Sequence, residues 1–378
     1  MENTGGIPMA SKVYFTDFCT NGGAETLPQK LARLCLTAGM DQIDFQDKFV
    51  AIKIHFGELG NLAYLRPNYA KVVVDLVKDM GGKPFLTDAN TMYVGSRKNA
   101  LDHLETAYLN GFTPYSTGCH VIIADGLKGT DDVEVPVVGG EYCKTARIGR
   151  AVMDADIVIS LSHFKGHEEA GFGGCLKNIG MGCGSNEGKR DMHSDGRPLV
   201  DPEKCVGCGE CAKNCAHDGP QMQPDGIMKI NWQNCMGCGR CIDCCPVKAI
   251  YHDSHEATKV LNAKIAEYTK AVIDGRPSFH INMVLDVSPY CDCWNSNDLP
   301  IVSDIGMFAS FDPVALDLAC CEAVNAQCAL PGSKLDQSDR KGIDDNLTAN
   351  SPHTDWRSQI SHGKKIGLGE DSYELIRI

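Results

Sequence analysis

Apolar residues along this chain alternate between short β-branched runs and longer stretches with helical spacing. Residues 49–56 form a β-branched run that predicts a strand. Helical apolar spacing follows over residues 67–80, the pair Gly81-Gly82 predicts the end of that helix, and residues 84–87 predict a second strand. The pattern is typical of a β-α-β unit.

The same alternation continues to residue 325. Strands are predicted at residues 120–124, 156–161, 280–287 and 300–302. Helices are predicted at residues 97–109, 145–153, 256–273 and 313–325. Asp312 is suited to cap the last of these helices, and Pro313 is suited to its first position. We expect an α/β fold with a mainly parallel sheet flanked by helices, and a long loop over residues 332–354.

Two cysteine runs interrupt this pattern. Both have the spacing C-x2-C-x2-C-x3-C, and the second begins thirty positions after the first; the cysteines are Cys205, Cys208, Cys211, Cys215, Cys235, Cys238, Cys241 and Cys245. Such a loop has to direct several thiolates inward, and the glycines within each run leave the backbone free to curl. Paired zinc knuckles are the structural alternative, because C-x2-C pairs also bind zinc.

The spacing resembles that of bacterial dicluster ferredoxins, in which the fourth cysteine of each run ligates the other cluster. The resemblance implies two 4Fe-4S clusters, one held by Cys205, Cys208, Cys211 and Cys245, and the other held by Cys235, Cys238, Cys241 and Cys215. Ala216 stands where the first motif often has proline. Cys244 adjoins a ligand position, and we expect it to be a spectator.

Because strand and helix patterns resume after the cysteine runs, we expect an inserted α+β ferredoxin-like domain at residues 197–251. The α/β host domain would then comprise residues 1–196 and 252–378, with a separate third domain as the alternative. A formal charge of -13 argues against a nucleic-acid partner. Residues 1–8 lack the features of a signal peptide, and no run of eighteen apolar residues occurs, so we expect a cytoplasmic chain without membrane insertion.

Polar residues follow several predicted strands and suggest one shared site, because ligands collect beyond the carboxyl ends of parallel strands. These residues are His55 with Glu58, Asp88 with Asn90, Asp125, His163 with Lys165 and His167, and Asp286. The alternative for each is a capping or loop role.

The densest stretch, residues 162–184, is polar and rich in glycine. Its glycines would let the backbone approach a ligand, and its lysines could hold a phosphate or carboxylate. We therefore expect Gly174, Cys175, Lys177 and Asn178 to bind an anionic substrate or cofactor. A mobile connector is the plainer alternative, and a metal held by His163, His167 and nearby cysteines is a third.

Four blocks resemble the family called domain of unknown function 362. They are residues 53–57, 162–167, 174–180 and 310–317. The resemblance covers most of the chain and implies the α/β fold and the iron-sulfur segment, since members often contain a dicluster ferredoxin segment. It implies no substrate. No nucleotide-binding glycine motif is present, and a flavin or an additional metal is supported by no motif.

Three functions compete. In the first, an external donor supplies electrons to the clusters, and a site in the host domain reduces an anionic molecule, with His55, His163, Lys165 and His167 as catalytic candidates. In the second, the chain carries electrons and the host domain only docks partners. In the third, the clusters sense oxygen or redox state. Cys320, Cys321 and Cys328 are expected to pack in the core, whereas the roles of Cys291 and Cys293 stay open.

Overall fold

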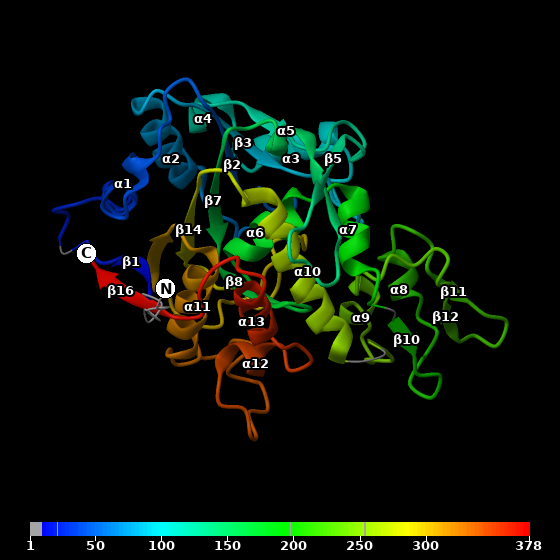
Figure 1. Cartoon of the computed structure of the whole chain (residues 1–378). Coiled ribbons are helices and arrows are strands. Elements are labelled where there is room, and N and C mark those ends of the chain that lie inside the picture. Colours follow the sequence, from blue (N-terminus) through cyan, green and yellow to red (C-terminus); the bar gives the residue numbers. More distant parts are fainter. Residues whose placement is uncertain (1–9, 21, 197, 253–254) are drawn as a thin grey trace, which may run out of the picture.

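The computed structural model describes residues 10–20, 22–196, 198–252 and 255–378, so Arg197, where we expect the inserted segment to begin, and the N-terminal residues 1–8 lie outside it. An eight-stranded sheet forms the centre of the molecule (Figure 1). In spatial order its strands are β16 (Tyr373–Arg377), β1 (Ser11–Asp17), β15 (Gly306–Ser310), β14 (Ser278–Val284), β7 (Ile157–His163), β2 (Phe49–Lys53), β3 (Lys83–Asp88) and β4 (Val121–Ile123).

Seven of these strands run in one direction. Neighbours β14, β7, β2, β3 and β4 pair in parallel, and β1 pairs in parallel with β16. Only β15 is reversed, because it pairs antiparallel with both β14 and β1. The predicted α/β fold with a mainly parallel sheet is confirmed.

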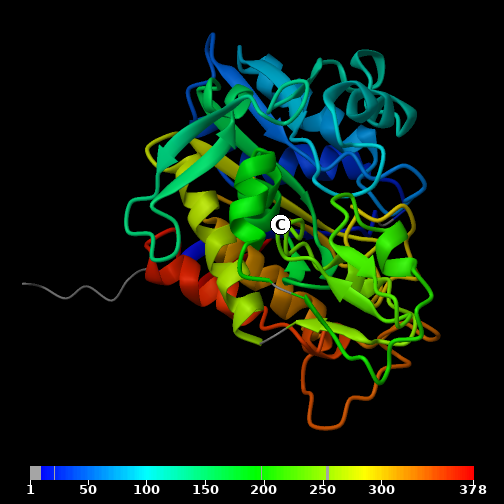
Figure 2. The same ribbon diagram turned by 90° about the vertical axis from the view of Figure 1, so that its right-hand side faces the viewer.

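Helices cover both faces of the sheet. One face carries α1 (Leu27–Thr37), the short 3-10 turn η1 (Met40–Gln42), α2 (Pro67–Asp79), α3 (Ala100–Leu109) and α4 (Pro114–Thr117). The other carries α5 (Arg150–Met153), α6 (Cys175–Cys183), α7 (Asn186–His193), α10 (His255–Ile273), α11 (Pro313–Asn325), α12 (Asn346–Asn350) and α13 (Arg357–Lys365). Figure 2 shows α7 and the long α10 together in front of the sheet.

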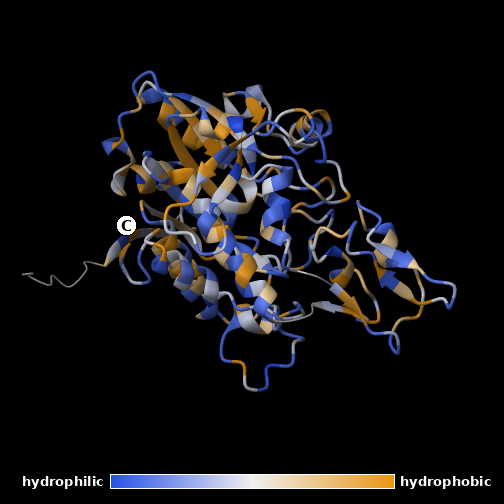
Figure 3. Ribbon diagram, turned by 45° about the vertical axis from the view of Figure 1, so that its right-hand side comes forward, coloured by the Kyte–Doolittle hydropathy of each residue, from blue (hydrophilic) through white to orange (hydrophobic). Residues whose placement is uncertain are grey.

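Two hydrophobic cores result, one on each face. Along β7, Ile157, Ile159 and Leu161 enter the core beneath α1 and α2, whereas Val158 points to the opposite core. Alternation of this kind follows from the pleat of a strand. Figure 3 shows the central strands as the most apolar part of the ribbon. Among the described helices, none combines the length and the apolar character needed to cross a bilayer.

Two predicted elements are wrong. Residues 145–153 were predicted as one helix, but they form β6 (Thr145–Gly149) followed by the short α5, and β6 pairs with β5 (Asp132–Pro136). Ala146 and Ile148 are both buried, so the period along this segment is two. Residues 300–302 join no sheet; the strand of this region is β15, a few residues later.

The glycine-rich stretch contains regular structure instead of a mobile connector. Its first part forms a hairpin of β8 (Lys165–His167) and β9 (Gly171–Gly173), and its second part forms α6. A side chain at Gly180 would collide with the backbone oxygen of Ile265 on α10. This glycine therefore serves close packing between two helices.

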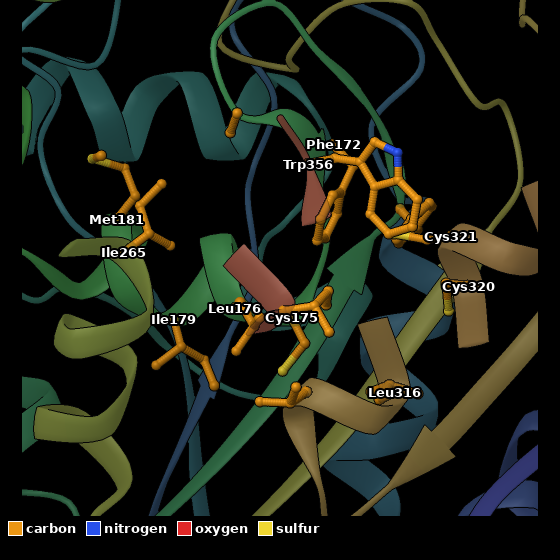
Figure 4. Close-up of a cluster of buried hydrophobic side chains, with 14 of the residues drawn as sticks. Phe172, Cys175, Leu176, Ile179, Met181, Ile265, Leu316, Cys320, Cys321 and Trp356 are labelled. Carbon is orange, nitrogen blue, oxygen red and sulfur yellow. The ribbon is translucent and has the colours of Figure 1, made fainter. Parts of the chain in front are cut away.

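Several cysteines belong to the core around α6 and α11. Cys175, Cys320 and Cys321 lie among apolar side chains such as Leu176 and Phe172 (Figure 4), and all three are fully buried. The prediction of core packing is confirmed for Cys320 and Cys321. It is wrong for Cys328, which lies just beyond the end of α11 and is exposed.

The cysteine runs lie in a small lobe with its own core, drawn in green at the right of Figure 1. Its elements are β10 (Pro198–Val200), α8 (Glu210–Lys213), β11 (Pro220–Met222), β12 (Met228–Ile230), α9 (Arg240–Asp243) and β13 (Ile250–His252). The first and last strands pair antiparallel, which brings the two ends of the segment together. Gly209 and Gly239 begin α8 and α9 with left-handed backbones, as the tight cysteine loops require.

The second cysteine loop packs directly against the rest of the chain. A side chain at Gly237 would collide with the backbone oxygen of His193, at the end of α7. Arg240 stacks over the ring of Trp294 at 3.5 Å, and its guanidinium donates to the backbone oxygen of Cys293 at 3.5 Å. In the first loop, nothing lies within 4 Å of a side chain built at Gly209, whereas a side chain at Gly207 would collide with the backbone oxygen of Gly226 in the same lobe.

These differences predict unequal effects of two alanine substitutions. Both Gly209→Ala and Gly237→Ala place a side chain on a left-handed backbone, with φ of 76° and 72°, at a cost of about 1 kcal/mol. Gly237→Ala must in addition displace the backbone carbonyl of His193. It should therefore lower the thermal unfolding midpoint of the full chain clearly more than the control, Gly209→Ala. Equal midpoints in scanning calorimetry would show that the second loop does not pack as described.

Candidate functional site

The eight cysteines of the two runs surround two separate hollows. The first hollow has a volume of about 290 Å³, including space open to solvent, and its lining includes Cys205, Cys208, Cys211 and Cys245. The second hollow has a volume of about 350 Å³, measured in the same way, and its lining includes Cys215, Cys235, Cys238 and Cys241. Each hollow thus takes three cysteines from one run and one from the other, because the fourth cysteine of each run lies across the lobe.

The hollows do not have the form of a site for one metal ion. Around zinc, bonds of about 2.3 Å would hold the four sulfurs roughly 3.8 Å apart. Within the described part of the chain, no three His, Cys, Asp or Glu side chains converge closely enough to hold a single ion. That finding also applies to the proposed metal site of His163, His167 and nearby cysteines.

Cys244 differs from its neighbour Cys245. Its sulfur lines neither hollow and instead contacts the backbone oxygens of Glu210 at 3.8 Å and Cys241 at 3.7 Å. Burial raises the pKa of the Cys244 thiol to about 12, so this side chain is a neutral thiol at physiological pH.

A third pocket lies at the carboxyl edge of the sheet, beside α6. Its volume is about 620 Å³, and part of this volume is open to solvent. Its polar walls are Lys53, His55, Asp88, Thr91, Tyr93, Arg97, His163, Lys165, Lys177, Asn178, Lys189, Cys291 and Cys293. Five of these side chains are cationic and only Asp88 is a carboxylate, so the pocket favours an anion.

The parallel sheet explains why these residues meet. Lys53, Asp88 and His163 are the last residues of the adjacent strands β2, β3 and β7, and parallel strands end at one edge. Asn178 fastens α6 to that edge, since its amide nitrogen donates to the backbone oxygen of Lys53 at 3.0 Å and to Ser162 at 3.0 Å. Asn178 is therefore an anchor of the pocket wall.

Two of the cations are neutralised by a buried network. The ammonium of Lys53 lies 2.9 Å from Asp88, and the guanidinium of Arg97 lies 3.1 Å from Glu58 and 3.6 Å from Asp88. Burial alone would raise the pKa of Asp88, but the charge of Lys53 together with His103 and His55 outweighs burial and holds the pKa well below its usual value. One guanidinium nitrogen of Arg97, Nη2, is buried without a hydrogen-bond partner among the described residues.

His163 is held from both sides. Nδ1 donates to the Asp292 carboxylate at 2.8 Å, and Nε2 donates to the backbone oxygen of Leu285 at 2.9 Å. The ammonium of Lys165 lies 3.6 Å from the same carboxylate. Burial would raise the pKa of Asp292, but His163 and Lys165 outweigh it and hold that pKa well below its usual range. Both ring nitrogens of His163 are engaged, so this histidine positions the wall and has no free nitrogen for proton transfer.

The other two predicted histidines accept backbone hydrogen bonds. Nδ1 of His55 accepts from the N–H of Gly57 at 3.0 Å, and burial lowers the pKa of His55 to about 3. His55 therefore faces the pocket as a neutral donor through Nε2. Nδ1 of His167 accepts from the N–H groups of Glu169 and Ala170, each at 3.1 Å. His167 does not line the pocket, but its ring reaches the sulfur of Cys291.

Two predicted binding residues lie elsewhere. Gly174 and Cys175 begin α6 on its core side, where the N–H of Cys175 donates to the buried Asp317 carboxylate at 2.8 Å. They do not reach the pocket that holds Lys177 and Asn178. Asp286 also lies outside the lining.

Sequence reasoning did not find Arg97, Tyr93, Lys189 and Asp292. Loops and α7 supply them, and no local pattern marks such positions. Lys53 carried a usable signal, because a lysine inside a β-branched strand needs a buried partner.

The pocket adjoins the second cysteine hollow. Arg240 and His217 line that hollow. Arg240 donates to the backbone oxygen of Cys293, which lines the pocket, and His217 Nε2 donates to the backbone oxygen of Met92, the residue before Tyr93, at 2.8 Å. Burial raises the pKa of Tyr93, and the charges of Cys293 and Cys238 add to this effect. Arg240 therefore links the linings of the two cavities.

Fold and site together define an α/β protein with a cysteine-rich, two-repeat lobe beside a cationic pocket. The family model of the domain of unknown function called DUF362 matches residues 50–322, which include the lobe and the whole pocket. The chain belongs to this family.

Individual relatives are more distant. Over 161 residues the chain is 27% identical to the thylakoid-associated protein sll1697 of Synechocystis sp., an alignment that covers 39% of this chain and 44% of that protein. The lactate racemase apoprotein of Thermoanaerobacterium thermosaccharolyticum is 15% identical with a TM-score of 0.39, covering 80% of this chain and 52% of the other. A Thermotoga maritima structure is 12% identical with a TM-score of 0.41, covering 78% and 57%. The chain spans about half the length of these proteins.

Because the Asp292 carboxylate is buried and bears the counter-charge of two cations, we expect its replacement to lower the stability of the protein strongly. Asp292→Asn leaves His163 and Lys165 without their counter-charge, so it should lower the free energy of unfolding by about 3 kcal/mol at pH 7. Because the folded pKa of Asp292 lies below its unfolded value of about 3.9, this contribution is present above pH ~4 and is lost as the pH falls further. In thermal unfolding from pH 3 to pH 7, the difference between the two midpoints should begin to narrow below pH ~4 and should still be present at pH 3, because the folded pKa of Asp292 lies well below that pH. Asp298→Asn, in an exposed part of the same loop, is the control.

Proposed function

We propose that this protein is an iron-sulfur redox protein that passes electrons from two 4Fe-4S clusters to an anionic small molecule or cofactor bound in the cationic pocket. The observation that carries the proposal is the link through Arg240, which lines the second cysteine hollow and donates to the backbone oxygen of Cys293 in the pocket lining. Two four-cysteine hollows without single-ion geometry support clusters as their occupants.

When bound, each cluster would supply or accept one electron at a time. The cysteines assigned to the two clusters are those that line the two hollows. Cys208 of the first set is exposed, so an external electron partner has access on that side. Arg240 lines the second hollow, whereas Tyr93 lines the pocket. This order suits delivery from the surface, through the lobe, to the pocket.

Residues of the pocket would bind and orient the anion. Lys177 is half-buried, and no hydrogen bond or ion pair holds its ammonium among the described residues, so a ligand carboxylate or phosphate can pair with it. Nη2 of Arg97 offers a second buried donor. Neutral His55 offers an N–H at Nε2 without adding charge. Lys53 and Lys165 are already paired with carboxylates and would raise the local potential instead of contacting the ligand.

Cluster content is tested first with two adjacent cysteines. After strictly anaerobic purification, the wild-type chain should contain about eight iron and eight sulfide per molecule. Cys245→Ser removes a side chain of the first hollow and should reduce the iron content to about half. Cys244→Ser, the matched control, should leave it unchanged. Iron-free protein, or equal losses in the two variants, would reject the cluster assignment.

Anion binding is tested with inorganic phosphate and oxalate by titration calorimetry. Lys177→Gln removes a charged hydrogen-bond donor and should weaken binding of at least one probe about tenfold. Lys98→Gln removes an exposed ammonium next to Arg97 that does not line the pocket, and it should have no effect. If neither probe binds, and mass spectrometry finds no small molecule released from the anaerobic protein, the chain is better explained as an electron carrier.

A further inference from the structure

Cys291 and Cys293 form a compact pair on the loop between β14 and β15. Both side chains line the cationic pocket. A tight turn holds them, because the N–H of Trp294 donates to the backbone oxygen of Cys291 at 3.1 Å. Inside this turn the N–H of Cys293 donates to the sulfur of Cys291 at 3.4 Å. The turn therefore holds the two cysteines together in the lining of the pocket.

The surroundings of Cys291 favour a thiolate. Hydrogen bonding from Cys293, and then the charge of Lys177 and a hydrogen bond from His167, hold the pKa of Cys291 well below that of an ordinary thiol. The core cysteines are different. Burial among apolar side chains raises the pKa of Cys320 and Cys321 well above the usual value. A cysteine needed only for packing requires no such polar partners.

Asp292 keeps the pair facing the pocket. Its carboxylate is fully buried and is bound by His163, while its backbone oxygen accepts from the N–H of Glu58 at 2.9 Å. On the other side of the turn, Arg240 holds the backbone of Cys293 and stacks on Trp294, whose ring N–H donates to Glu168 at 2.8 Å. The pair is therefore fixed between the pocket and the wall of the second cysteine hollow.

We propose that Cys291 and Cys293 are a redox-active dithiol, which forms a reversible disulfide and collects single electrons into a pair at the pocket. In the reductive direction the Cys291–Cys293 bond breaks, each sulfur gains one electron, and one proton is taken up by the sulfur of Cys293, while Cys291 becomes a thiolate. The two electrons would be supplied one at a time by an external one-electron donor through iron-sulfur clusters held in the two cysteine hollows. The proton enters from solvent through the pocket, where His167 and Lys177 stabilise the Cys291 thiolate.

This electron source depends on the proposed function, but the dithiol itself does not. A metal at the same place is not favoured, since within the described residues no third His, Cys, Asp or Glu side chain joins the pair in ion-binding geometry. The pocket is open to solvent, so small thiol reagents can reach the pair.

The first experiment tests the bond without using the clusters. The full chain is equilibrated anaerobically in graded dithiothreitol redox buffers, free thiols are alkylated, and the peptide that contains residues 291–293 is examined by mass spectrometry. We expect a reversible loss of two hydrogen atoms from this peptide, with the bond mapped to Cys291 and Cys293. Alkylation of both thiols under every condition would overturn the proposal, and this readout needs no variant to fold.

Variants then locate the reaction. Cys291→Ser and Cys293→Ser should each abolish the redox-dependent mass change, while Cys328→Ser, which removes an exposed cysteine on another element, should retain it. A change that persists in either of the first two variants would assign the bond to other cysteines and reject the pair.

A second experiment separates the dithiol from its electron source. Disulfide-form protein with clusters reduced by light and deazaflavin should regain two thiols as the reduced-cluster signals in electron paramagnetic resonance disappear. Cys238→Ser removes a side chain of the second hollow. This variant should still form the disulfide in dithiothreitol buffers, but light and deazaflavin should no longer lead to reduction of the disulfide. Disulfide formation without iron would contradict the proposed function alone, whereas clusters that stay reduced beside an intact disulfide would overturn the transfer proposed here.

Discussion

Burial of positive charge at the carboxyl edge of the sheet is the constraint on which the rest of this structure depends. An unpaired buried ammonium or guanidinium costs several kcal/mol, so the surrounding chain has to supply an acceptor for each. Lys53 has Asp88, Arg97 has Glu58, and Lys165 shares Asp292 with His163. These pairs join β2, β3, β7 and three separate loops. The positions of the residues around the pocket are therefore explained by the pairing of buried charges.

Local patterns were sufficient to predict the elements whose residues are adjacent in sequence. The strand at residues 49–53, the following helix, the next strand and α11 with its Asp312 cap were all predicted from period and capping. Where partners are distant, prediction failed: the reversed strand β15, its neighbour β1 and the edge strand β16 exist because of long-range pairing. At residues 145–149 the segment was too short to distinguish a period of two from a helix.

Parts of the candidate site were predictable for the same reason. Cysteine spacing is local, and the ferredoxin resemblance that it carries implied the same two sets of four cysteines that line the two hollows. His55, His163, Lys165 and Lys177 follow strands or begin α6, and the parallel sheet brings them to one pocket. Arg97 and Asp292 come from loops whose position is decided by tertiary packing. The glycines of residues 162–184 were interpreted as sites where the backbone approaches a ligand. Gly174 and Gly180 instead allow α6 to pack closely against neighbouring elements. The sequence alone does not distinguish these two uses of glycine.

The antiparallel pairing of β10 with β13 has a consequence for how such a chain can change over time. Pro198 and His252 face each other across the two strands, so the lobe enters and leaves the molecule at neighbouring points, about 5 Å apart. A gene segment coding for it can be gained, lost or exchanged with little rearrangement of the remaining fold. A member of the family that exchanged this lobe would keep the pocket residues of the sheet edge, because the strands that carry them lie outside the exchanged segment.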